Sequence, residues 1–145
     1  MLRIPSGVCG AAALTLAVGV VALPAARQPS TPSVRDGVYT TEQADRGEVL
    51  YDEQCAVCHG AIRQFVPEMA ALLGDHNFRN AWRGRSLGEM FGYIQETMPQ
   101  DAPGTLTAAQ TAEIVAHILR GNRLPAGEAA LPEDEETLNG IPFDP

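Results

Sequence analysis

The chain has 145 residues, which allows one small domain with one hydrophobic core but not two. Ten basic residues, all of them arginine, stand against eighteen acidic residues and give a net charge of −8. An acidic balance of this size argues against nucleic acid and anionic membrane surfaces as the main partners.

The first 26 residues are predicted to be a targeting segment. A short basic start at residues 1–3 precedes an uncharged apolar run at residues 8–23, and small residues follow ahead of Arg27. This pattern is typical of a cleaved secretory signal peptide and predicts an exported, periplasmic protein. The alternative is a retained membrane anchor, because about 20 apolar residues can span a bilayer. In both cases Cys9 belongs to the targeting segment and not to the fold.

The remaining chain divides by composition into three parts. Residues 27–39 contain several Pro, Ser and Thr residues and are predicted to be a flexible linker. Residues 40–123 are predicted to form the folded domain. Residues 124–145 form a Pro-containing tail with six acids and no base. The tail is expected either to be disordered or to anchor itself on the domain through Leu131, Leu138, Ile141 and Phe143.

The domain is predicted to be all-α, because no segment alternates polar and apolar residues. A first helix is expected over about residues 41–54 and a short one near residues 67–73. Another begins at the capping box of Ser86 and Glu89 and ends near Thr97, since Pro99 disfavours helix at the residue before it.

A last helix opens at the capping box of Thr107 and Gln110 and is closed by Gly121. Three or four helices give a small core, and domains of this size usually need a disulfide, a metal or a cofactor to stabilise them.

The end of the first helix carries the pentapeptide Cys55-Ala56-Val57-Cys58-His59. The spacing C-x-x-C-H is typical of covalent haem attachment, in which both thiols bond to the haem and the adjacent imidazole ligates its iron. Three other interpretations compete: a Cys55–Cys58 disulfide, a thioredoxin-type dithiol, and a structural zinc site completed by His76 or His117. A disulfide would leave His59 without a role, and a thioredoxin-type dithiol needs a strand before the motif. A zinc site would take three ligands from one pentapeptide, which is too crowded for tetrahedral coordination.

With these motifs the sequence resembles the small class I c-type cytochromes. The matching features are residues 47–51, the haem-attachment motif with Gly60, Pro67, residues 73–74, Met98-Pro99 and the helix around residues 114–119. The resemblance implies a small cytochrome c fold of three to five helices around one covalent haem c. The cytochrome modules of periplasmic quinoprotein alcohol dehydrogenases are also similar at Phe78 and at residues 82–87, 97–99 and 124–127.

The second axial ligand of the iron is expected to be Met98. Met98 follows the end of a helix and is held in extended backbone by Pro99, and the resemblance places an axial Met in this Met-Pro context. His76 is the main alternative. The remaining candidates are less suited. Met90 is assigned to the apolar core face of its helix, Met69 is close to His59 in sequence, and His117 takes an aromatic packing position.

The haem surroundings are predicted from the same resemblance. Pro67 lies where the family places a carbonyl that accepts the His59 ring hydrogen. Trp82, Arg83 and Arg85 are candidates to meet the haem propionates, the alternative being a solvated turn.

We therefore expect a single-electron carrier and not an enzyme, with His59 and Met98 as axial ligands. Expected partners are redox proteins such as a periplasmic dehydrogenase or a terminal oxidase, and the membrane only if the anchor is retained. Two alternatives remain open: a cytochrome subunit of a quinoprotein dehydrogenase, and a haem sensor or peroxidase with an open iron site.

Overall fold

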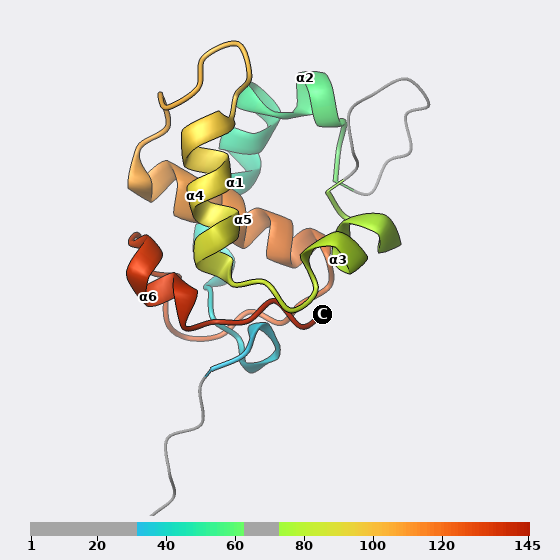
Figure 1. Ribbon diagram of the computed structural model, residues 1–145, viewed down its shortest axis with the longest axis vertical. Helices are drawn as coiled ribbons and strands as arrows, with labels where there is room; N and C mark the ends of the chain where they lie inside the picture. The colour runs from blue at the N-terminus through green and yellow to red at the C-terminus, as the bar shows by residue number, and fades with distance from the viewer. Residues whose placement is uncertain (1–31, 63–72) are drawn as a thin grey trace, which may run out of the picture.

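The computed structural model describes residues 32–62 and 73–145. Within these ranges the chain forms six α-helices and one 3-10 turn, and no strand, so the all-α prediction is confirmed (Figure 1). The elements are η1 (Val34–Asp36), α1 (Thr41–Gln54), α2 (Ala56–His59), α3 (His76–Trp82), α4 (Leu87–Thr97), α5 (Ala108–Gly121) and α6 (Glu135–Asn139). No helix in the described ranges is long and apolar enough to cross a bilayer. The expected targeting segment lies outside these ranges.

Both predicted capping boxes are present. The Ser86 hydroxyl accepts from the Glu89 N–H at 3.0 Å, and the Glu89 carboxylate accepts from the Ser86 N–H at 2.9 Å. Thr107 and Gln110 make the equivalent pair at the start of α5. α4 ends at Thr97, and Met98 is extended with φ −122° and ψ 148°, as expected ahead of Pro99.

Two short helices, α2 and α3, were not expected. α3 starts at Asp75, whose carboxylate accepts from the Phe78 N–H at 2.8 Å and so satisfies one of the free N–H groups of the first turn. The short helix expected near residues 67–73 falls almost entirely outside the described residues.

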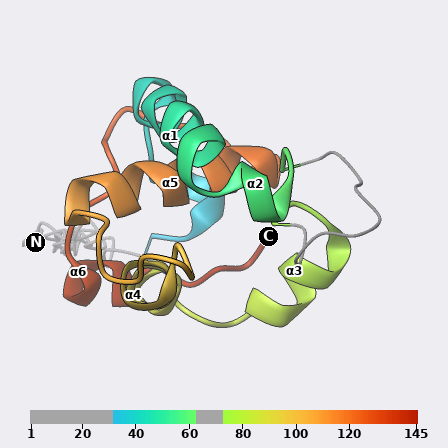
Figure 2. The ribbon, with the colours of Figure 1, turned by 90° about the horizontal axis from the view of Figure 1, so that it is seen from above.

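The two longest helices, α1 and α5, cross closely. A Cβ atom added at Gly47 of α1 would lie 1.8 Å from the Glu113 carbonyl oxygen of α5, so only glycine allows this approach. One turn later the Tyr51 and His117 rings pack with centroids 5.1 Å apart. Figure 2 shows α1 lying across α5.

Residues 33–39 are folded, in contrast to the flexible linker that composition predicts. Ser33 caps η1, and the side chains of Val34 and Tyr39 are buried. The Tyr39 hydroxyl donates to the Leu124 carbonyl oxygen at 2.7 Å. The linker prediction therefore does not hold for this stretch, because its apolar residues pack on partners about 85 residues away in sequence.

The acidic tail packs on the domain. Leu131, Leu138, Ile141 and Phe143 are all buried, as the anchoring alternative expects. The Gln43 side-chain amide of α1 exchanges two hydrogen bonds with the Leu131 backbone, at 3.0 and 2.7 Å. The tail then forms α6 beside α4 and crosses below the start of α4 towards α3, where the chain ends (Figure 1).

Candidate cofactor site

One cavity brings together the four residues predicted to attach haem and to ligate its iron. The cavity has a volume of about 520 Å³ and is lined by Cys55, Cys58, His59 and Met98. Its apolar wall comes from Leu73, from Ile94 of α4, and from Ile114 and Ile118 of α5. This volume lies within the range of pockets that hold organic cofactors.

The C-x-x-C-H motif is wound into a single helical turn that presents its reactive side chains to the cavity. The Cys55 N–H closes α1 by donating to the Tyr51 carbonyl at 2.8 Å, and the Cys58 and His59 N–H groups both donate to the Cys55 carbonyl at 3.0 and 2.9 Å. Gly60 then leaves the turn at φ +65°, a conformation that favours glycine. The buried Tyr51 hydroxyl donates to the Gly60 carbonyl at 2.9 Å and so fastens the end of the motif to α1.

The two cysteines are free thiols in different surroundings. Cys55 is buried and Cys58 is exposed, and no disulfide joins them. Burial raises the pKa of the Cys55 thiol to about 11, and the neighbouring Cys58 acts in the same direction. Redox-active dithiols of the thioredoxin type have a lowered thiol pKa instead, so the environment of Cys55 does not fit that alternative.

The zinc alternative also lacks a site. Among the described residues, no group of three or more His, Cys, Asp and Glu side chains is arranged to hold a metal ion. His76 is exposed at the start of α3, and His117 lines a different, charged cavity with Arg120, Glu48 and Asp52. Burial and Arg120 lower the pKa of His117.

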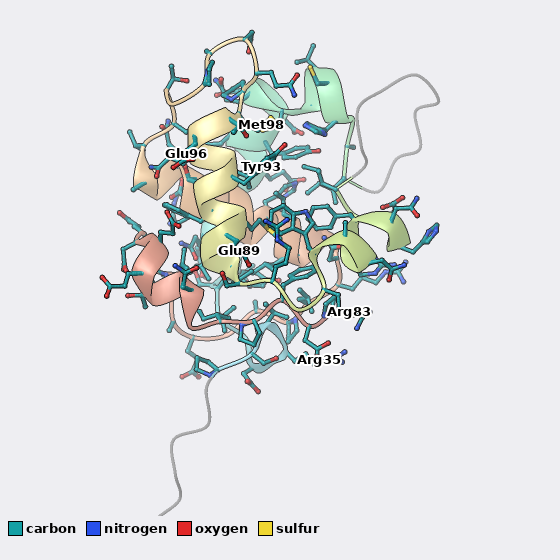
Figure 3. All side chains as sticks on the ribbon, viewed as in Figure 1. Arg35, Arg83, Glu89, Tyr93, Glu96 and Met98 are labelled. Atoms are coloured by element: carbon teal, nitrogen blue, oxygen red, sulfur yellow. The ribbon has the colours of Figure 1, made fainter. Side chains whose placement is uncertain are left out.

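Met98 reaches the cavity from a different element than His59. Its N–H donates to the Ile94 carbonyl at 2.9 Å, so its backbone continues rigidly from the last turn of α4. Figure 3 shows Met98 at the end of α4. Of the other candidate ligands, Met90 is a core residue with 1% of its surface exposed, neither His76 nor His117 lines this cavity, and Met69 lies outside the described residues.

The predicted propionate residues do not line this cavity. Trp82 packs against Phe78 and Tyr93, with ring centroids 6.1 and 6.0 Å apart, and the Arg85 guanidinium lies 4.1 Å above its ring. Arg83 makes an ion pair with Asp144 at 3.3 Å and lies far along the molecule from Met98 in Figure 3. Pro67 lies outside the described residues. The propionate contacts and the Pro67 contact therefore stay predictions.

The residues around the cavity suit a large, flat, apolar cofactor with an iron centre. Two thiols and an imidazole come from one turn, a thioether sulfur comes from another element, and branched aliphatic side chains form the walls. The apolar residues of a helical sequence pattern can line a cavity or fill the core, and periodicity does not separate the two, so the cavity roles of Ile94, Ile114 and Ile118 were not predicted.

Comparison with known families places most of the folded domain in a described family. The family model described as "Cytochrome C oxidase, cbb3-type, subunit III" matches residues 42–118, which is more than half of the chain. The match runs from the start of α1 into the last turn of α5 and contains all four cavity residues named above. No curated relative and no solved structure matches the chain.

Proposed function

We propose a function from the premise that the chain belongs to the family of cytochrome c oxidase, cbb3-type, subunit III, through its residues 42–118. It is therefore a cytochrome c domain, and membership implies covalent haem c and haem-based electron transfer, with the role of a carrier rather than an enzyme. The observation that carries the finer proposal is the single cavity shared by Cys55, Cys58, His59 and Met98.

We infer that Cys55 and Cys58 attach one haem and that His59 and Met98 are its axial ligands. When bound, such a haem supplies one-electron redox chemistry, and a Met ligand raises its reduction potential relative to a second His. The chain's own contribution would be to offer the His59 imidazole from the attachment turn and the Met98 thioether from the end of α4, and to line the cavity with aliphatic side chains that exclude water.

The exposed side of the attachment turn gives a partner access to this site. Val57, between the two cysteines, has 75% of its surface exposed, and Cys58 beside it is exposed as well. An electron partner would therefore approach the site from this side, because the cavity wall formed by Ile94 of α4 and by Ile114 and Ile118 of α5 is buried.

The test of the axial ligands is the visible spectrum of the purified holoprotein with matched methionine variants. We expect a weak band near the red edge of the oxidised spectrum, which reports the bond between Met and iron. Met98→Leu should keep covalent haem, lose this band, lower the potential and allow CO to bind. Met90→Leu, a volume-conserving change in the core, should keep the wild-type spectrum. If Met98→Leu also keeps the band, Met98 is not the ligand, and His76 becomes the next candidate.

We propose that the protein works in the periplasm between a donor and an acceptor. The family name points to a terminal oxidase as the acceptor. The likeness of residues 82–87 and 124–127 to cytochrome modules of quinoprotein dehydrogenases favours a periplasmic dehydrogenase as the donor, and makes a dehydrogenase subunit the second candidate. Co-purification of a dehydrogenase from the native source supports the subunit, whereas isolation as a separate protein that both partners turn over supports the shuttle. A sensor or peroxidase would require an open iron site, which the spectrum above tests.

A further inference from the structure

The C-terminal segment of residues 131–145, here called the strap, lies beyond the residues that match the cytochrome family. It contains α6 and four buried anchors: Leu131, Leu138, Ile141 and Phe143. Phe143 is fully buried and packs edge-on against Phe78 of α3, with ring centroids 5.9 Å apart. Because these four side chains are buried, the strap is an integral part of the folded domain.

The strap docks on a stripe of glycines on α4. A Cβ atom added at Gly88 would lie 2.3 Å from the Asn139 side-chain oxygen and 2.6 Å from the Glu135 carbonyl oxygen of α6. One turn later, the atoms nearest to a Cβ added at Gly92 would be those of the Glu135 carboxylate, from 3.0 Å. The two helices therefore touch through their backbones at Gly88, which a larger residue would prevent.

Hydrogen bonds fasten the strap to the start of α4. The Leu87 N–H, one of the helix N–H groups without a partner inside α4, donates to the Ile141 carbonyl at 2.9 Å. The Gly84 N–H donates to the Phe143 carbonyl at 3.0 Å, and the Phe143 N–H donates to the Arg85 carbonyl at 2.7 Å. Ser86, the N-cap of α4, donates through its hydroxyl to the Asn139 side-chain oxygen at 2.7 Å.

The other side of α4 faces the cofactor cavity. Ile94, which lines the cavity, lies about 140° around the helix from the Gly88 and Gly92 stripe at about 100° per residue. Met98 follows directly, with its N–H bonded to the Ile94 carbonyl. α4 is thus fixed by the strap along one side and carries the proposed axial ligand at its end.

We propose that the strap positions Met98 by fixing α4, with Gly88 as the positioning residue on which this docking depends. The inference rests on the proposed function, since it takes Met98 to be the axial ligand. A displaced strap leaves α4 free to shift, and a shift of α4 moves the Met98 sulfur relative to His59 across the cavity. Gly88 is a positioning residue because a side chain added there would meet the strap, and Gly88 does not line the cofactor cavity.

The test compares two glycine variants of the same helix in the holoprotein. Gly88→Ala and Gly92→Ala both add one methyl group and both favour helix, so any loosening cannot come from loss of helix propensity. Gly88→Ala must push back the α6 backbone, whereas Gly92→Ala displaces only the tip of a flexible carboxylate. The readouts are the band that reports the bond between Met and iron, the reduction potential, and the affinity of the oxidised protein for imidazole, which competes with Met98.

We expect Gly88→Ala to bind imidazole about tenfold more tightly than wild type, within the range of about 2- to 30-fold for mutations that couple distant sites. Its band should weaken and its potential fall, while Gly92→Ala should stay within about twofold of wild type. Tyr39→Phe controls for general destabilisation, because it removes the hydrogen bond to the Leu124 carbonyl, which involves no residue of α4 or of the strap. It should lower the melting temperature and leave imidazole affinity unchanged.

Equal imidazole affinity in Gly88→Ala and Gly92→Ala would overturn the positioning role, and so would an equal rise in Tyr39→Phe. If Gly88→Ala yields no holoprotein, Phe143→Ala takes its place in the same comparison, because it loosens the strap from its far end. A wild-type protein without the Met–iron band would instead overturn the proposed ligand. The two failures are therefore distinguishable.

Discussion

Gly47 is the position at which a single added carbon should disturb the domain most directly. In a Gly47→Ala variant the new Cβ would lie 1.8 Å from the Glu113 carbonyl oxygen, where ordinary contact begins at 3.4 Å, so α1 and α5 must separate locally by about 1.6 Å. Backbone atoms cannot rotate away, so the cost should reach about 3 kcal/mol, the upper end for overpacked cores. Alanine has a higher helix propensity than glycine and offsets about 1 kcal/mol of this cost, so the free energy of unfolding should fall by about 2 kcal/mol in total.

For a chain of this size that loss corresponds to a fall of about 4–8 °C in the melting temperature. The assay is thermal unfolding of the holoprotein followed by far-UV circular dichroism. Gly92→Ala is the matched control, because it adds the same methyl group to a helix but meets only the flexible Glu135 carboxylate. If Gly47→Ala has the same melting temperature as the wild type, α1 and α5 do not cross as closely as in the structure.

Two further expectations concern the cofactor and His117. A Cys55→Ala/Cys58→Ala double variant should carry no covalent haem and should lose most of its helical circular dichroism, because the apolar cavity wall then faces water; a full helical spectrum would contradict this. Burial and Arg120 place the pKa of folded His117 below its ordinary 6.5, while Glu48 and Asp52 act the other way. Between the pKa of His117 in the folded chain and its higher pKa in the unfolded chain, the unfolded chain binds more protons. The free energy of unfolding therefore falls as the pH falls through this range. The melting temperature of His117→Phe should therefore drop less than that of the wild type between about pH 7 and pH 5. Parallel curves for His117→Phe and the wild type would argue against the shift.

Features set by neighbouring residues could be predicted from the sequence. The capping boxes at Ser86 and Thr107 fix the starts of α4 and α5, and Pro99 fixes the end of α4. The C-x-x-C-H spacing identified the residues that meet in the cavity, because three of them lie within one helical turn. α3 was missed because it is short: its buried contact comes mainly from Phe78, too little for a periodic apolar pattern.

Features set by distant partners could not be predicted. The stretch around Tyr39 has the composition of a linker, and only its contact with Leu124 shows that it is folded. Arg83 was a candidate for a propionate, but its local sequence cannot show that Asp144, 61 residues later, lies within ion-pair distance. The role of Gly88 and Gly92 on α4 likewise depends on the strap that packs against them, which their local sequence does not indicate.

The placement of charge favours the cavity rim over the tail as the place where a cationic partner is attracted. The tail acid Glu133 is exposed just before α6 and Glu136 is exposed within it. α6 packs on the first two turns of α4, whereas Met98 follows the other end of α4. Glu53 and Asp101 line the cofactor cavity itself. Electrostatic attraction acts on association rate and is screened beyond about 10 Å at 0.1 M salt, so the acids beside the cofactor should dominate.

The corresponding experiment follows oxidation of the reduced holoprotein by hexaammineruthenium(III), a small cationic oxidant, in a stopped-flow instrument. Glu53→Gln/Asp101→Asn should slow the reaction by about two- to tenfold at low ionic strength, and the difference should vanish at high salt. Glu133→Gln/Glu136→Gln removes the same amount of charge from the tail and leaves the strap's buried anchors intact. It should have little effect on the rate. A larger effect of the tail pair would instead make the acidic tail the surface that attracts the partner, since both variants change the net charge equally and only the position of the charge differs.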